Sequence, residues 1–97
     1  MAEAHSNLGV IYSQQNHLNK AIAEYKKAIR LKPNYADAHN NLGNAYREQG
    51  NLDEAIRECE AAIGINPNMA LAHYNLARIY SLKNEKTLAI ESLQKAM

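Results

Sequence analysis

The 97-residue sequence contains no tryptophan and no phenylalanine, and all six of its aromatic residues are tyrosine. So few aromatic residues do not suit one large central core, and we expect alanine, leucine and isoleucine to supply most of the buried surface. Hydrophobic residues make up 46% of the chain and charged residues 22%, which excludes the composition of a disordered protein. The length allows one domain, or one part of a larger array.

An excess of charge of one sign is also missing. The formal net charge is only +1, whereas nonspecific binding of nucleic acid needs a clear basic excess. One basic run lies between Lys26 and Lys32. No such run recurs later in the chain, so we interpret it as a solvent-exposed helix face. We therefore expect no nucleic-acid partner.

Cys59 is the only cysteine, which excludes an intrachain disulfide and fits a reducing compartment. The opening segment MAEAHSNLGV lacks the basic stretch and following apolar run of a signal peptide. No apolar run in the sequence approaches the length of a membrane span. From these absences we expect a soluble, cytoplasmic protein with no membrane partner.

The chain does contain an internal repeat, which is tested before secondary structure because it decides the fold class. The segments AEAHSNLG, ADAHNNLG and ALAHYNLA begin at Ala2, Ala36 and Ala70, which gives the same offset of 34 residues twice. When residues 2–35 are aligned with residues 36–69, 16 of the 34 positions are identical. We therefore divide the chain into three units, the last of them truncated and without a separate capping helix: residues 2–35, 36–69 and 70–97.

Each unit contains two helical patterns separated by a short break. In the second unit Leu42 and Tyr46 lie on one helix face, because they are spaced four residues apart. Gly50 interrupts this unit, and Pro33 and Pro67 lie between units. Glycine ends a helix by adopting the left-handed conformation, and proline cannot continue one. The sequence thus predicts an all-α protein of six helices in three antiparallel hairpins, each of which packs only against its neighbours.

This pattern resembles the tetratricopeptide repeat (TPR). The family's Trp-x2-Leu-Gly-x2-Tyr element appears twice, as His5-x2-Leu8-Gly9-x2-Tyr12 and as His39-x2-Leu42-Gly43-x2-Tyr46, and its closing proline appears as Pro33 and Pro67. The third unit departs from the pattern, with Ala77 in place of glycine and Leu93 in place of the aromatic residue. The resemblance covers the whole chain. It implies a right-handed α-solenoid of three helix-turn-helix hairpins that acts as a protein–protein interaction scaffold.

The resemblance also implies that the first helix of each unit lines a concave groove. Asn7, Asn41 and Asn75 share one repeat position there, and a carboxamide can pair with both the N–H and the C=O of a peptide backbone. They resemble the asparagine ladder in the superhelix of O-linked N-acetylglucosamine transferase, which implies an extended protein or peptide partner. The alternative is that these asparagines only connect neighbouring helices. The candidate groove residues are Asn7, Asn41, Asn75, Asn40, Asn44, Asp37, Arg47, Glu48, Tyr74 and Arg78.

No residue pattern predicts an enzyme, a cofactor or a metal site. His5, His39 and His73 recur at one repeat position, but stacked helices lie about 8–10 Å apart, whereas zinc needs ligands about 2 Å from one centre. We interpret these histidines as packing residues at the position of the family's tryptophan. Cys59 lies between two glutamates, which raise the pKa of a thiol rather than lower it, so we expect an unreactive core thiol.

Three further readings of the chain follow from the resemblance. The family's carboxylate clamp is not expected, because only Asn41 matches its five groove positions. Head-to-tail self-assembly stays open, since the chain stops within its third unit and would leave Leu82, Leu88 and Leu93 near an uncovered edge. The chain could also be a fragment of a larger TPR-containing enzyme whose catalysis lies elsewhere.

Overall fold

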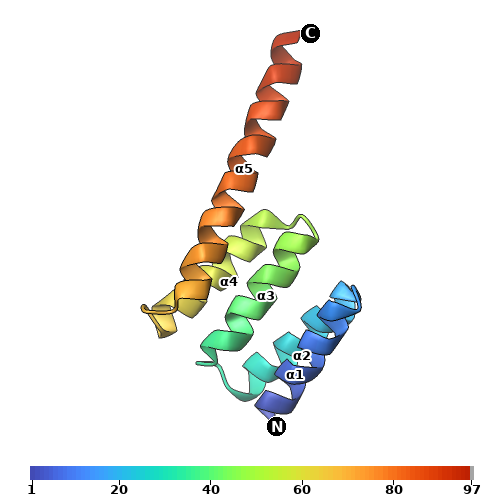
Figure 1. Ribbon diagram of the computed structural model, residues 1–97, viewed down its shortest axis with the longest axis vertical. Helices are drawn as coiled ribbons and strands as arrows, with labels where there is room; N and C mark the ends of the chain where they lie inside the picture. The colour runs from blue at the N-terminus through green and yellow to red at the C-terminus, as the bar shows by residue number, and fades with distance from the viewer. Residues whose placement is uncertain (97) are drawn as a thin grey trace.

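The structure, a computed structural model, describes the backbone of residues 1–96 and the side chains of residues 1–86. The described residues form five helices, α1 (Ala2–Gln14), α2 (Leu18–Leu31), α3 (Ala36–Glu48), α4 (Leu52–Ile65) and α5 (Ala70–Ala96). Helices α1 and α2 form one hairpin, α3 and α4 form a second, and α5 packs against the second hairpin (Figure 1). The all-α prediction is confirmed, and the handedness of the expected solenoid stays a prediction.

The first four helices end where the sequence predicts breaks. Asn16 and Gly50, which follow α1 and α3, have the left-handed φ values of 63° and 83°. Lys32 and Asn66, which follow α2 and α4, have extended φ values of −141° and −132°. Each of these two residues precedes a proline, whose ring disfavours the helical conformation of the residue before it.

Two small apolar clusters connect the helices, and each joins the second helix of a hairpin to the next helix along the chain. The first cluster consists of Ala21, Ile22, Tyr25, Leu42 and Ala45, from α2 and α3. The second consists of Ala55, Ile56, Cys59 and Ile79, from α4 and α5. Alanine fills much of both clusters, and each helix packs only against helices close to it in the chain. This is the neighbour-to-neighbour burial expected of stacked repeats.

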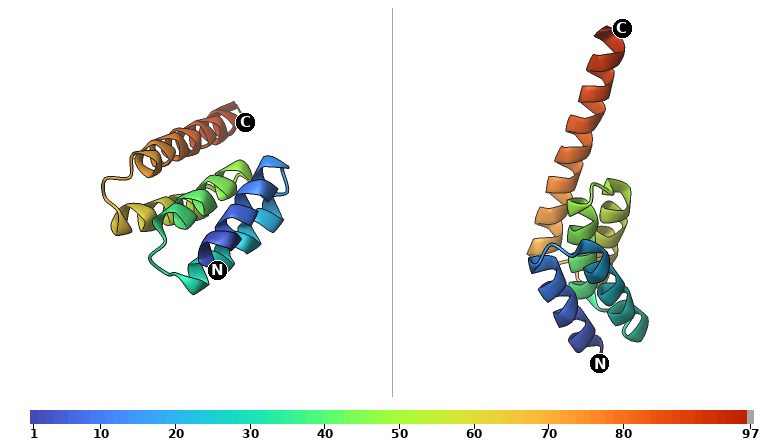
Figure 2. Two further views of the ribbon diagram at one scale, coloured as in Figure 1. Left: turned by 60° about the horizontal axis from the view of Figure 1, so that its bottom comes forward. Right: turned by 90° about the vertical axis from the view of Figure 1, so that its right-hand side faces the viewer.

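The prediction of six helices is wrong, because the third unit forms one continuous helix instead of a hairpin. The second half of α5 extends past the other helices (Figure 1 and Figure 2). Leu18 and Leu52 follow the first two turns, and the matching residue of the third unit is Lys86. Leu52 packs on the second apolar cluster. A lysine gives no such apolar contact, so a continuous helix that keeps all of its backbone hydrogen bonds is favoured.

The extended α5 makes the molecule long and narrow, with dimensions of 53 × 29 × 18 Å. The N-terminus and the end of α5 lie at opposite ends of the long axis (Figure 1). Helix α5 is 27 residues long. Even so, within residues 1–96 no helix combines the length and the apolar character that crossing a membrane requires.

Candidate functional site

A hollow of about 360 Å³ lies between α3 and α5, and we call it the α3–α5 hollow. The residues that line it are Asn40, Asn41, Asn44, Arg47, Leu71, Tyr74, Asn75 and Arg78. All of them except Leu71 belong to the candidate groove residues that the sequence predicts. The structure therefore brings these side chains to one surface, where their role in binding stays a prediction.

The other three candidate residues do not line the hollow. Asn7 is exposed on α1, and Asp37 is exposed in the first turn of α3. Glu48 ends α3, where its carboxylate accepts a hydrogen bond of 3.4 Å from the amide of Asn44. Asn7 thus lies apart from the asparagines that line the hollow.

The three asparagines of the shared repeat position have different surroundings. Asn7 is exposed, Asn41 is half-buried and Asn75 is buried. The Asn75 Nδ2 donates a buried hydrogen bond of 3.0 Å to Asn40 Oδ1, which ties α5 to α3. Asn75 therefore connects two neighbouring helices, which is the structural role that the sequence predicts as the alternative to peptide binding.

Two arginines give the α3–α5 hollow its charge. The Arg47 side chain is only 14% exposed, and its Nε donates to Asn44 Oδ1 at 3.2 Å. Arg78 is exposed, and its guanidinium lies over the Tyr74 ring, 5.6 Å from the ring centroid. Both guanidinium groups are thus held by a neighbour on their own helix.

Sequence reasoning missed the partners of the repeated histidines. The Nδ1 of His5 lies 2.8 Å from Glu24 Oε1, and the Nδ1 of His39 lies 2.8 Å from Glu58 Oε1. Hydrogen bonds from His5 and then from Lys27 lower the pKa of Glu24, so its carboxylate accepts both bonds. Each pair joins the two helices of one hairpin.

The spacing of these pairs was visible in the sequence, since a glutamate follows the histidine by 19 residues in the first two units. The Nε2 of His39 also lies 3.0 Å from the carbonyl oxygen of Pro33, and that of His73 lies 2.8 Å from the carbonyl oxygen of Pro67. The histidines thus connect helices and loops. In the part of the chain that the structure describes, no three His, Cys, Asp or Glu side chains form a possible metal site.

Cys59 is fully buried against α3. Burial raises the pKa of its thiol to about 11, and the charge of Glu58 adds to the increase. The expected direction of this shift is confirmed, although burial contributes more than the neighbouring glutamates. A thiol that stays protonated at neutral pH is a poor nucleophile.

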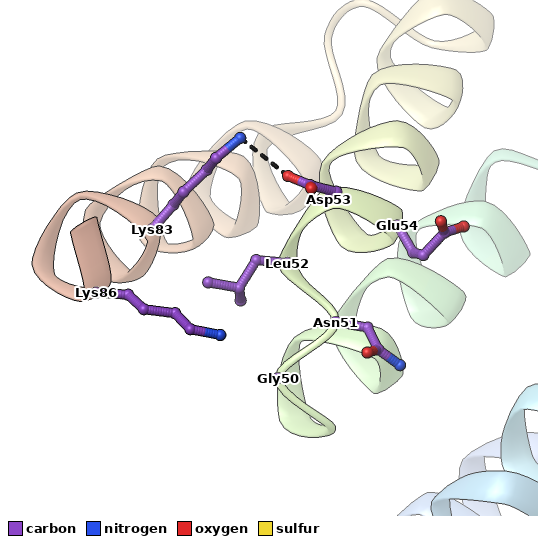
Figure 3. Close-up of a pocket in the computed structure, with 7 residues that line it drawn as sticks. All are labelled: Gly50, Asn51, Leu52, Asp53, Glu54, Lys83 and Lys86. Atoms are coloured by element: carbon purple, nitrogen blue, oxygen red, sulfur yellow. Dashed lines mark hydrogen bonds and ion pairs between the residues drawn. The ribbon is translucent and has the colours of Figure 1, made fainter. Parts of the chain in front are cut away.

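A second hollow, of about 400 Å³, lies where α5 passes the turn between α3 and α4 (Figure 3). Its lining mixes charges of both signs, Asp53 and Glu54 with Lys83 and Lys86. Lys83 donates a hydrogen bond of 2.9 Å to Asp53, and both side chains are largely exposed. Exposed ion pairs of this kind contribute little to stability. The mixed charges of this hollow favour no particular ligand.

Two solved structures are similar to this chain over almost its whole length. They carry the titles "Crystal structure of MamA" and "Crystal structure of MamA protein", with TM-scores of 0.84 and 0.83. Each is 32% identical to this chain and matches 99% of it. The chain spans only 56% and 52% of those two chains, or little more than half of their length. Among proteins of curated function, none matches the chain significantly by sequence.

Three family models match the sequence, and together they cover residues 11–97. One is described as "TPR repeat" and matches residues 11–50. The other two are both described as "Tetratricopeptide repeat", and they match residues 36–69 and 70–97. These matches agree with the repeated helical hairpins and with the similar solved structures. The chain belongs to the tetratricopeptide repeat family.

Proposed function

We propose that the chain is a protein–protein interaction module that binds an extended peptide segment in the α3–α5 hollow. The observation that supports this function is the convergence of four asparagines, two arginines and a tyrosine on one open surface. TPR repeats typically mediate contacts between proteins, and they generally act as nonenzymatic scaffolds. Binding would use the asparagine amides for the backbone of the partner and the charged and aromatic groups for its side chains.

The arrangement of the hollow modifies the ladder that the sequence suggests. Asn75 and Asn40 already share one hydrogen bond and are only 9% and 5% exposed; the Nδ2 of Asn40 and the Oδ1 of Asn75 make no further hydrogen bond among the described residues. One donor and one acceptor side by side are the complement of a single peptide group. Asn41 lines the same hollow and is half-buried. In this proposal the hydrogen-bonded Asn40–Asn75 pair and Asn41 bind the peptide backbone, in place of three equivalent asparagines at one repeat position.

A peptide array followed by titration of the best peptides tests this function. Substituting Ala at Asn7, Asn41 and Asn75 together should weaken binding by at least about tenfold, because the hydrogen bonds of Asn41 and of the Asn40–Asn75 pair to the peptide backbone are lost. The single variant Asn41→Ala is the cleaner measurement, since Asn75 also connects α5 to α3. Thermal unfolding separates lost binding from lost fold. Wild-type affinity in the folded triple variant would contradict the proposal.

Self-association is a second candidate function, and the surface of α1 favours it. Leu8 and Ile11 are 37% and 49% exposed. Their counterparts in the second unit, Leu42 and Ala45, are buried against α2 of the unit before them. A second copy could cover the exposed face in the same way, by placing its third unit against α1. Leu82 is 39% exposed, and the side chains of Leu88 and Leu93 lie outside the described residues.

A further inference from the structure

We propose that the α3–α5 hollow selects a peptide segment with an internal acidic side chain, held between Arg47 and Arg78. This inference rests on the proposed peptide-binding function and names the chemistry of its partner. It follows from the charges around the hollow, from how the two arginines are held, and from the apolar groups beside them.

The charges around the α3–α5 hollow favour an anionic ligand. The lining residues include two arginines and no carboxylate, although the whole chain has 10 acidic residues against 11 basic ones. The nearest carboxylate to Arg47 belongs to Glu48, whose Oε1 lies 4.0 Å from Arg47 Nη2. That distance is too long for a hydrogen bond. Glu48 offsets part of the Arg47 charge, but Arg78 has no such neighbour among the described residues, so the hollow keeps a cationic excess that complements an anionic group.

Arg47 is already held in position by Asn44. Its Nε and Nη2 both donate to Asn44 Oδ1, so the guanidinium is fixed against α3 and loses little freedom on binding. Its Nη1 makes no hydrogen bond or ion pair with any described residue. A guanidinium has five N–H donors, so donors remain for a carboxylate of the partner.

Arg78 has no carboxylate partner among the described residues. Its guanidinium lies over the ring of Tyr74, an arrangement that leaves the N–H groups at its edge available. An arginine stacked on an aromatic ring can still bind a carboxylate through two parallel hydrogen bonds. Arg47 on α3 and Arg78 on α5 thus offer donors from both walls of the hollow.

The surroundings of the arginines define the rest of the partner. Leu71 and Tyr74 are 65% and 59% exposed beside Arg78, so an apolar residue next to the acidic one would cover them. The Nδ2 of Asn40 and the Oδ1 of Asn75, which make no further hydrogen bond among the described residues, suit a peptide group in the middle of a chain. The favoured ligand is therefore an extended segment in which an Asp or Glu lies beside an apolar side chain, rather than a free chain end.

Fluorescence anisotropy with matched peptides tests this inference. The probe is a labelled nonapeptide of Gly-Leu-Glu triplets with both ends blocked, and its control is the same peptide with Gln in place of Glu. We expect the Glu peptide to bind the wild-type protein about tenfold more tightly or better, as a charge-assisted hydrogen bond predicts. The preference should decrease as salt is added. Arg78→Gln should remove most of this preference.

Arg57→Gln is the matched control variant, because Arg57 is a surface arginine of α4 that does not line the hollow. It should leave the preference for the Glu peptide unchanged. An equal loss in Arg57→Gln and Arg78→Gln would overturn the inference, since the preference would then reflect overall charge. A Gln peptide with a free C-terminal carboxylate supplies the other source of the anion. If it binds as tightly as the blocked Glu peptide, the preference for an internal acidic residue is wrong.

The two proposals fail in different ways. If the wild-type protein binds the Glu and Gln peptides equally, and Asn41→Ala weakens both, the acidic preference is wrong and the peptide-binding function stands. If neither peptide binds, the acidic preference is wrong, and the peptide array with the Asn41→Ala variant decides the peptide-binding function. NMR titration of the labelled protein locates the bound peptide, which should shift amide signals in α3 and α5 and leave those of α2 unchanged.

Discussion

At the scale of single residues, two glycines of the second hairpin lie in opposite environments. A Cβ at Gly43 would lie 2.8 Å from the Cys59 Sγ and 3.1 Å from the Ala55 carbonyl oxygen, whereas one at Gly64 would meet nothing within 4 Å. Gly43→Ala should therefore push α3 and α4 apart and lower the free energy of unfolding by about 1–3 kcal/mol. Gly64→Ala should raise it by up to about 1 kcal/mol, because glycine weakens a helix. Denaturant unfolding measures both, and equal stabilities would contradict this account.

Glu24 makes the stability depend on acid pH. Hydrogen bonds from His5 and Lys27 lower its pKa below the ordinary value of 4.5. As the pH falls, the Glu24 carboxylate is therefore protonated at a higher pH in the unfolded chain than in the folded one. The stabilisation by these bonds is complete above the ordinary pKa, and it is lost as the pH falls through the lowered folded pKa. We expect the melting temperature to fall below about pH 5. The Glu24→Gln variant should be less stable than the wild-type protein at pH 7, and its stability should decrease less as the pH falls.

Asp53 provides the control for this experiment. The hydrogen bond from Lys83 lowers its pKa as well, but Asp53 and Lys83 are largely exposed, and exposed pairs contribute little. Asp53→Asn should therefore keep most of the pH dependence of the wild-type protein. A pH profile flattened more by Asp53→Asn than by Glu24→Gln would contradict the role of Glu24.

The sequence predicts single residues well where the repeat pattern decides burial. Cys59 is the core thiol that the pattern predicts, because its position is apolar or aromatic in the other units. The role of the histidines was predicted only in part. Their packing position follows from the repeat, but their bonds to Glu24 and Glu58 depend on how two helices face each other. The Asn40–Asn75 hydrogen bond also depends on how two helices face each other, since it joins residues of different units.

At the scale of helices, the breaks that contain Gly50, Pro33 and Pro67 are found where the sequence predicts them. Each has a local cause in the backbone, so no knowledge of tertiary packing is needed. The third unit could not be predicted from its similarity to the others, because the residues after its first half differ from theirs, with Lys86 where the other units have Leu18 and Leu52. Ala77 is consistent with this. Ala77 is exposed, whereas Gly9 and Gly43 lie against Tyr25 and Cys59.

Rebuilding the turn of the second unit in the third should convert α5 into a hairpin. The variant Lys83→Gln, Asn84→Gly, Glu85→Asn, Lys86→Leu copies the sequence of residues 49–52. It restores a glycine for the left-handed conformation and a leucine for the apolar contact. Small-angle X-ray scattering should show a maximum dimension clearly shorter than that of the wild-type protein, whose long axis measures 53 Å.

A variant with alanine at the same four positions is the control for the rebuilt turn. Alanine favours a continuous helix, so this variant should keep the extended shape of the wild-type protein. Circular dichroism should show similar helix content in both variants. Identical scattering curves for the two variants would contradict the importance of the turn residues.

At the scale of the whole molecule, the arrangement in stacked units leaves an apolar face uncovered on α1. Leu8 and Ile11 lie on this face, and the corresponding face of α3 is buried by α2 within the chain. If a second copy covers α1 in the same way, the protein should associate as its concentration rises. Sedimentation velocity over a concentration series measures this, and a monomer at every concentration would rule out self-association as a function of this chain.

Ile11→Lys should decrease this association, because it places a charge in the contact at a position that is already 49% exposed in the monomer. Leu31→Lys is the matched control, since Leu31 is 56% exposed on α2, away from the face of Leu8 and Ile11. Both variants replace an exposed apolar side chain, so they should change the stability of the monomer little. Only the α1 variant should shift the association to higher concentration. Equal shifts in both would mean that general surface hydrophobicity, rather than repeat-to-repeat stacking, brings the copies together.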